Sequence, residues 1–267
     1  MDLGLDGATA VVTGGSKGMG RAVAEALAAE GARVAVMARG RDALDATVDA
    51  LWQAGARECV GITADFADAA SVTAAFEEIG ARWDALNVLV HTVGPGSGTF
   101  ESLDDAGWED AFGRGTLSAV RAVRCALPLL RRAEWARVCT FGAVSVRRPN
   151  ARTVAYSAAK AALANLTKNL SKTLAPEGIL VNCVCPGTIV TASFTEALRP
   201  VLAAEGLDSG DPVAVMEWIG RTFHESAGLG RAGLPEEVAA LAAFLVSRRN
   251  GYVTGATVNA DGGSDFY

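Results

Sequence analysis

The sequence lacks the features of several protein classes. No run of about 18 apolar residues occurs in its 267 residues, so we expect no membrane-spanning helix. No block of like charges is present, and the formal net charge of −6 argues against a nucleic-acid-binding surface. The N-terminus has no basic start followed by an apolar stretch, so we expect no signal peptide and a cytoplasmic protein.

Residues that bind metals are also scarce. The chain has two histidines and five cysteines, with no Cys-x-x-Cys pair and no Cys/His spacing typical of zinc sites. We therefore expect no metal site and interpret the cysteines as free thiols packed in the core. They are Cys59, Cys125, Cys139, Cys183 and Cys185.

What the chain does contain is a regular alternation of short β-rich runs and alanine-rich helical stretches. This order predicts a single α/β domain over residues 1–267, with a doubly wound parallel sheet of about seven strands and helices on both faces. The expected strands are 8–13, 33–38, 58–63, 86–90, 136–141, 179–184 and 256–259. The expected helices are 18–30, 42–53, 69–82, 103–131, 154–174 and 235–247.

A glycine-rich turn, Thr13-Gly14-Gly15-Ser16-Lys17-Gly18-Met19-Gly20, follows the first expected strand and opens the first helix. This context is typical of phosphate-binding turns, because the helix N-terminus offers free N–H groups. Gly14 permits a tight turn, and Gly18 and Gly20 permit close approach to a pyrophosphate. Glycine is common in turns of every kind, but the strand–turn–helix setting favours a dinucleotide site.

The second expected strand indicates which dinucleotide is bound. It ends in Ala38 and Arg39 without the carboxylate that bonds a ribose 2′-hydroxyl in NAD-binding sheets. Lys17 lies in the glycine turn. Two cations and no acid suit the 2′-phosphate of NADP(H), although both cations are also compatible with ordinary solvated positions.

Tyr156 and Lys160 are four residues apart in Tyr-Ser-Ala-Ala-Lys, so they share one face of a helix. A lysine near a phenol favours the phenolate and lowers a pKa that is ordinarily about 10. A phenol of this kind is able to transfer a proton while a nicotinamide transfers a hydride.

These motifs resemble those of the short-chain dehydrogenase/reductase family, of the single-domain type with T-G-x-x-x-G-x-G and Y-x-x-x-K, and the resemblance covers essentially the whole chain. It implies a Rossmann-like fold, an NADP(H) cofactor, a small-molecule carbonyl or alcohol substrate, and a homodimer or homotetramer. It also implies cofactor contacts from Tyr156, Lys160 and five further segments. These contacts are Thr13, Gly14, Ser16, Lys17, Gly18, Met19, Gly20, Arg39, Asp65, Phe66, Gly94, Pro186, Gly187, Ile189 and Thr191.

The chain departs from the family at its catalytic positions. The family's catalytic serine corresponds to Ala143, and its asparagine corresponds to Gly115. Ser145 is the nearest hydroxyl, but in extended chain it is displaced by about 6–7 Å, so it is a catalytic donor only if the loop folds back. Gly113 and Gly115 predict a local break in the helix at 103–131.

The two histidines have alternative interpretations. His91 replaces the first residue of the family's Asn-Asn-Ala-Gly segment, and we interpret it as a hydrogen-bonded core residue rather than a catalytic one. His224 lies near the end of residues 191–230, and either a surface position or hydrogen bonding to the substrate is compatible with the sequence.

Residues 191–230 have no expected strand, two expected helices and many apolar side chains. They predict a lid over a small apolar substrate, with contact to a neighbouring subunit as the alternative. We therefore expect an NADP(H)-dependent oxidoreductase that interconverts a carbonyl and an alcohol. Two alternatives remain open: a cofactor-binding protein with weak or no redox activity, and a reductase of an activated double bond.

Overall fold

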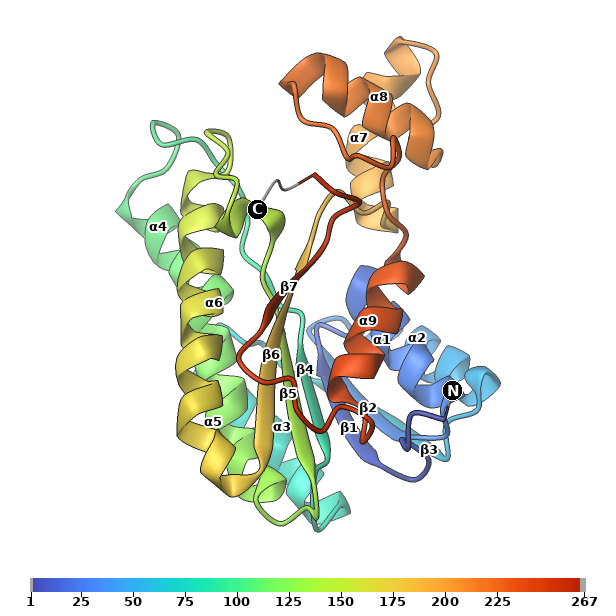
Figure 1. Ribbon diagram of the computed structural model, residues 1–267, viewed down its shortest axis with the longest axis vertical. Helices are drawn as coiled ribbons and strands as arrows, with labels where there is room; N and C mark the ends of the chain where they lie inside the picture. The colour runs from blue at the N-terminus through green and yellow to red at the C-terminus, as the bar shows by residue number, and fades with distance from the viewer. Residues whose placement is uncertain (1, 265–267) are drawn as a thin grey trace.

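Seven strands form one parallel sheet in the computed structural model, which describes residues 2–264 (Figure 1). The strand order is β3-β2-β1-β4-β5-β6-β7. Strands β1 to β3 therefore extend the sheet toward one edge, and β4 to β7 extend it toward the other, with the change of direction between β1 and β4. This confirms the predicted doubly wound, Rossmann-like sheet. The strands are β1 (Thr9–Thr13), β2 (Arg33–Ala38), β3 (Glu58–Thr63), β4 (Val88–His91), β5 (Ala136–Phe141), β6 (Ile179–Pro186) and β7 (Thr257–Ala260).

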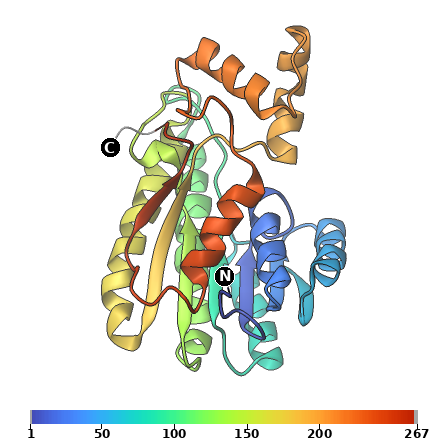
Figure 2. The ribbon, with the colours of Figure 1, turned by 45° about the vertical axis from the view of Figure 1, so that its right-hand side comes forward.

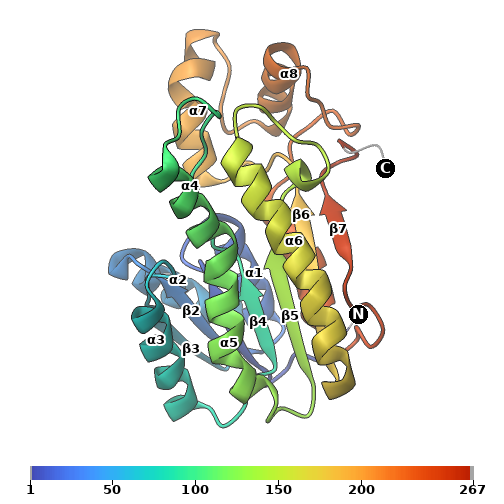
Figure 3. The same ribbon diagram turned by 90° about the vertical axis from the view of Figure 1, so that its left-hand side faces the viewer.

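Helices cover both faces of the sheet, because its strands are apolar on both sides. In β1, Val12 packs in one core with Leu27 of α1, whereas Val11 packs in the opposite core with Ile79 of α3. The first face carries α1 (Gly18–Ala29), α2 (Arg41–Ala54) and α9 (Pro235–Val246), as Figure 1 shows. The second face carries α3 (Ala69–Arg82), α5 (Ser118–Leu130) and α6 (Val154–Leu174), as Figure 3 shows.

Most expected elements agree with the structure to within about two residues, but the expected helix at 103–131 does not. The chain there forms α4 (Asp105–Phe112), a π-helical turn at Gly113–Leu117 and then α5. The predicted break is thus replaced by a continuous but wider turn. The reason is visible at Gly115, where a Cβ would lie 2.7 Å from Cβ of Ala159 in α6. The backbone of the turn contacts α6 directly, and Thr116 Oγ1 donates a hydrogen bond to the Ala159 carbonyl at 2.7 Å.

Residues 191–230 form α7 (Ala192–Ala204) and α8 (Pro212–Phe223), which lie beyond one end of the sheet (Figure 2). They have an apolar cluster of their own, in which Leu202, Val215 and Trp218 are buried. This agrees with the two expected helices. Among the residues described, no helix is both long and apolar enough to cross a membrane.

Candidate active site

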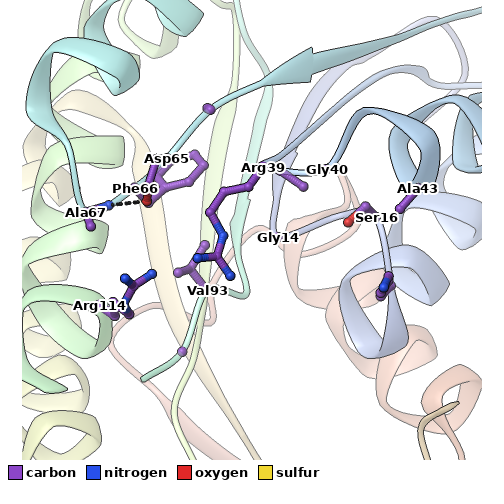
Figure 4. A pocket seen from close by; sticks show the side chains of 14 residues that line it. Gly14, Ser16, Arg39, Gly40, Ala43, Asp65, Phe66, Ala67, Val93 and Arg114 are labelled. Atoms are coloured by element: carbon purple, nitrogen blue, oxygen red, sulfur yellow. Dashed lines mark hydrogen bonds between the residues drawn. The ribbon is translucent and has the colours of Figure 1, made fainter. Parts of the chain in front are cut away.

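A cavity of about 330 Å³ lies at the carboxyl ends of β1, β2, β3 and β4 (Figure 4). The glycine turn forms one wall of it. Gly14 has a φ of +73°, and a Cβ there would lie 2.6 Å from Oγ1 of Thr92, so only glycine fits. A Cβ at Gly20 would collide with the Gly14 carbonyl oxygen. Helix α1 begins at Gly18, and Lys17 before it makes no side-chain cap, which leaves the first N–H groups for an anionic ligand.

The charges around this cavity suit a dinucleotide with an additional phosphate. Lys17 and Arg39 line it and are exposed, and within residues 2–264 neither forms an ion pair. Ala38 lines it without a carboxylate. Asp65, Phe66 and further residues form the opposite side. The cradle and the donor set therefore fit the predicted cofactor.

A second cavity, of about 480 Å³, lies at the same edge of the sheet and contains the phenol of Tyr156. Strand β6 and the segment after it contribute Pro186, Gly187, Ile189 and Thr191 to its wall. Met19 of the glycine turn also lines it. Most residues predicted to contact the dinucleotide thus line one of two cavities, and the glycine turn contributes to both of them.

Lys160 lies one helical turn after Tyr156 and is almost completely buried. Its Nζ donates to the carbonyl of Phe141 at 2.6 Å and to that of Val93 at 3.4 Å. Burial lowers the pKa of Lys160 to about 8. Carbonyl groups at the end of β5 and just after β4 therefore hold the lysine side chain in place.

The pKa of Tyr156 is raised, whereas the sequence predicted that Lys160 would lower it. Burial raises the pKa of Tyr156 to about 12, although the ammonium of Lys160 lies 5.9 Å from the centre of its ring. Burial disfavours the charged phenolate, and the neighbouring Cys185 adds to the same effect. The phenol is protonated at neutral pH and is ready to donate a proton.

Ser145 lies in a loop that folds back, as a donor at this position requires. Val144–Val146 form a 3₁₀ turn, so the chain folds back after Ala143 instead of continuing extended. Both Ala143 and Ser145 line the cavity that contains Tyr156. Ser145 Oγ is buried, and no hydrogen-bond partner for it exists among residues 2–264. An unpaired buried hydroxyl is costly in free energy.

His91 is a buried, hydrogen-bonded core residue, as predicted. Its Nδ1 lies 2.8 Å from Thr13 Oγ1 and its Nε2 lies 3.0 Å from Ser118 Oγ. Burial and then the charge of Lys160 lower the pKa of His91 to about 3, so the ring is neutral. His224 is exposed at the end of α8 and lies outside the residues that line the second cavity, which supports the surface interpretation.

Several residues around the cavities carried no sequence signal. Arg114 lines the first cavity, and Arg148, Asn150 and Glu225 line the second. They belong to a π-helical turn and to loops, and no motif or period marks such positions.

Four predicted cofactor residues lie behind the walls or beside them instead of lining either cavity. They are Thr13, Gly18, Gly20 and Lys160.

Known proteins resemble this chain along its whole length. A family model described as enoyl-(acyl carrier protein) reductase matches residues 14–265. The short-chain reductase protein NovJ of Streptomyces niveus is 35% identical over 258 residues, which are 95% of this chain and 92% of NovJ. The chain belongs to the short-chain dehydrogenase/reductase family.

Solved structures of the family have the same fold. L-Sorbose reductase from Gluconobacter frateurii, complexed with NADPH and L-sorbose, has a TM-score of 0.91 at 28% identity over 99% of this chain and 98% of that one. An NADPH-bound short-chain oxidoreductase from Pseudomonas aeruginosa PAO1, described as containing an atypical catalytic center, has a TM-score of 0.87 at 30% identity. The matched parts are 98% of this chain and 99% of the oxidoreductase.

A side chain larger than that of glycine has no room at position 115. Besides Ala159, Cγ of Pro95 would lie 3.2 Å from a Cβ at this position. A larger side chain requires the π-helical turn to move away from α6, which carries Tyr156 and Lys160. The glycine is therefore a requirement of helix packing.

We predict that Gly115→Ala destabilises the protein by about 1–3 kcal/mol, because the added methyl group overpacks the contact with Ala159. Gly113→Ala is the matched control, since nothing lies within 4 Å of a Cβ there. This control is expected to be neutral or to stabilise by up to about 1 kcal/mol, as alanine is the better helix former. Urea unfolding measures both, and equal stability of the two variants would contradict the packing argument.

Proposed function

We propose that this protein is an NADPH-dependent reductase that converts a carbonyl group to an alcohol and also catalyses the reverse reaction. One observation carries the proposal. A protonated phenol and an unpartnered buried hydroxyl, Tyr156 and Ser145, line one cavity beside a glycine turn that fits a dinucleotide. Related reductases with NADPH bound support the choice of cofactor.

The proposed chemistry divides between the cofactor and the chain. NADPH, when bound, supplies the hydride that reduces the carbonyl carbon. Tyr156 donates its phenolic proton to the carbonyl oxygen, so a hydride and a proton together complete the two-electron reduction. Lys160 stabilises the phenolate that remains, because its ammonium lies close to the ring.

Ser145 takes the role of the family's catalytic serine, whose position corresponds to Ala143 in this chain. Its hydroxyl donates a hydrogen bond to the substrate oxygen, where negative charge develops during hydride transfer. The hydroxyl has no partner to give up among residues 2–264, although its burial requires the cavity wall to shift before a substrate oxygen reaches it. This assignment fills the role of the family's serine, whereas no residue is assigned to the role of its asparagine at Gly115.

The cavity walls refine the expected substrate. Phe194, Met216, Ile219 and Phe223 form an apolar wall from α7 and α8. Polar groups line another part, where Asn150 Nδ2 donates to Glu225 Oε1 at 2.9 Å. We therefore propose a small substrate with both an apolar and a polar portion, which extends the small apolar substrate expected from the sequence. Assembly as a homodimer or homotetramer stays a prediction from family resemblance.

The cofactor assignment predicts that NADPH binds more tightly than NADH. Arg39→Met removes the free guanidinium and is expected to weaken NADPH binding by about 10- to 100-fold, because a charge-assisted contact contributes about 1.5–3 kcal/mol. NADH binding is expected to change little. Arg41→Met is the control, since this guanidinium pairs with Asp45 at 2.9 Å. Calorimetric titration measures the affinities, and equal or tighter NADH binding by the wild type would refute the assignment.

The catalytic roles predict a graded loss of activity. Tyr156→Phe is expected to abolish turnover, and Ser145→Ala to slow it by about 10²–10³-fold. Ala143→Ser is expected to leave the rate unchanged or to raise it. Ser157→Ala is the control, since its hydroxyl pairs with Thr153 at 3.2 Å. Single-turnover NADPH oxidation measures all four variants with a panel of activated ketones.

The same panel separates the alternatives. Undiminished oxidation in Tyr156→Phe would overturn the phenol as proton donor. Tight NADPH binding without oxidation of any panel member would favour a cofactor-binding protein. Enones belong in the panel because the matching family model is described as an enoyl reductase. Reduction of enones but not ketones, with no loss in Ser145→Ala, would favour reduction of an activated double bond.

We also propose that residues 191–230 form a substrate lid. Helices α7 and α8 share an apolar cluster, yet four of their apolar side chains face the second cavity. Amide hydrogen exchange in Ala192–Ala204 and Pro212–Phe223 is therefore expected to slow when NADP⁺ and an alcohol substrate bind together. Amides of β5 serve as the internal reference. Unchanged exchange in α7 and α8 would eliminate the lid.

A further inference from the structure

Arg114 is a charged residue of the first cavity that no motif marks. Figure 4 shows it on the side of Asp65 and Ala67, across the cavity from Ser16 of the glycine turn. Lys17 and Arg39, the candidates for phosphate contacts, belong to the turn and to the end of β2. Arg114 thus supplies a third cation to the cavity, from a different element.

The guanidinium of Arg114 is only partly used by the protein. Its Nε donates to Asp110 Oδ1 at 2.6 Å, and the side chain is 29% exposed. Neither terminal nitrogen has a hydrogen-bond partner among residues 2–264. The hydrogen bond to Asp110, with the charges of Asp110 and Asp65, raises the pKa of Arg114 above its ordinary value. The group is therefore a permanent, planar cation with free donors at the cavity wall.

The backbone at Arg114 is fixed to the glycine turn by a chain of hydrogen bonds. Ser118 Oγ donates to the Arg114 carbonyl, so Nε2 of His91 is the donor to Ser118. Nδ1 of His91 then accepts from Thr13 Oγ1, at the start of the turn. The neutral histidine joins the two walls of the cavity, which keeps the distance between Arg114 and the turn constant.

We propose that Arg114 binds the adenine ring of the cofactor, with its guanidinium stacked on the ring. The proposal rests on the proposed NADP(H) cofactor but not on the proposed reaction. A guanidinium is flat, weakly hydrated and attracted to aromatic faces, and it stacks more readily than an ammonium. The neighbouring Asp65 accepts a hydrogen bond from Ala67 N through Oδ1. Its Oδ2 has no hydrogen-bond partner within residues 2–264, so it suits the exocyclic amine of adenine. The phosphates have their own cations at the opposite wall.

The test compares three ligands that share different parts of the cofactor. NADPH has adenine and the 2′-phosphate, NADH has adenine alone, and reduced nicotinamide mononucleotide has neither. Arg114→Met is expected to weaken NADPH and NADH by the same factor, about 5- to 30-fold, since such a contact contributes about 1–2 kcal/mol when desolvated. Binding of the mononucleotide is expected to be unchanged. Asp110→Asn keeps the guanidinium and is expected to change each dissociation constant less than about twofold.

The other outcomes of these binding measurements overturn the proposal. Unchanged affinity for NADPH in Arg114→Met would exclude a contact. Weakening of NADPH but not NADH would assign the guanidinium to the 2′-phosphate, and weakening of all three ligands would assign it a purely structural role. A wild type that binds neither dinucleotide would overturn the cofactor assignment itself. A protein that binds NADPH but reduces nothing leaves the role of Arg114 intact, so the two failures are distinguishable.

Discussion

The parallel pairing of β1 with β4 is the constraint on which the site depends. Thr13 lies opposite His91 across this pair and opposite Met37 on the other side of β1. Because parallel strands end at the same edge, the pairing brings together the glycine turn, the chain after β2 and the chain after β4. The strand order reverses at this point, which leaves the first cavity between chain segments that turn to opposite faces of the sheet.

Burial governs the chemistry at this edge. It favours the neutral forms of both Tyr156 and Lys160, raising one pKa and lowering the other. The lysine tolerates its position because the carbonyl groups of Phe141 and Val93 accept its hydrogen bonds. The strand ends that form the cavity therefore also bind its charged lysine, and the phenol keeps its proton at neutral pH.

The unusual residues of the chain form one connected unit. Gly115 allows the π-helical turn to contact α6, and the same turn directs Arg114 to the first cavity. His91 fastens that turn to Thr13 through Ser118. His91 and Gly115 are thus two parts of one local packing arrangement. Local rules of helix propensity fail here because close contact between helices outweighs them.

The sequence by itself determined the sheet, most helices, the glycine turn and the Tyr156–Lys160 pair, since hydrophobic period and residue spacing encode local structure. Only the tertiary structure decided the properties that depend on contacts between separate helices, strands and loops. It replaced the expected helix break by a π-helical turn, raised rather than lowered the pKa of Tyr156, and turned Ser145 back into the cavity. It also brought Arg114 to the cavity, because no local pattern records which side chains meet when α4, α6 and the sheet pack together.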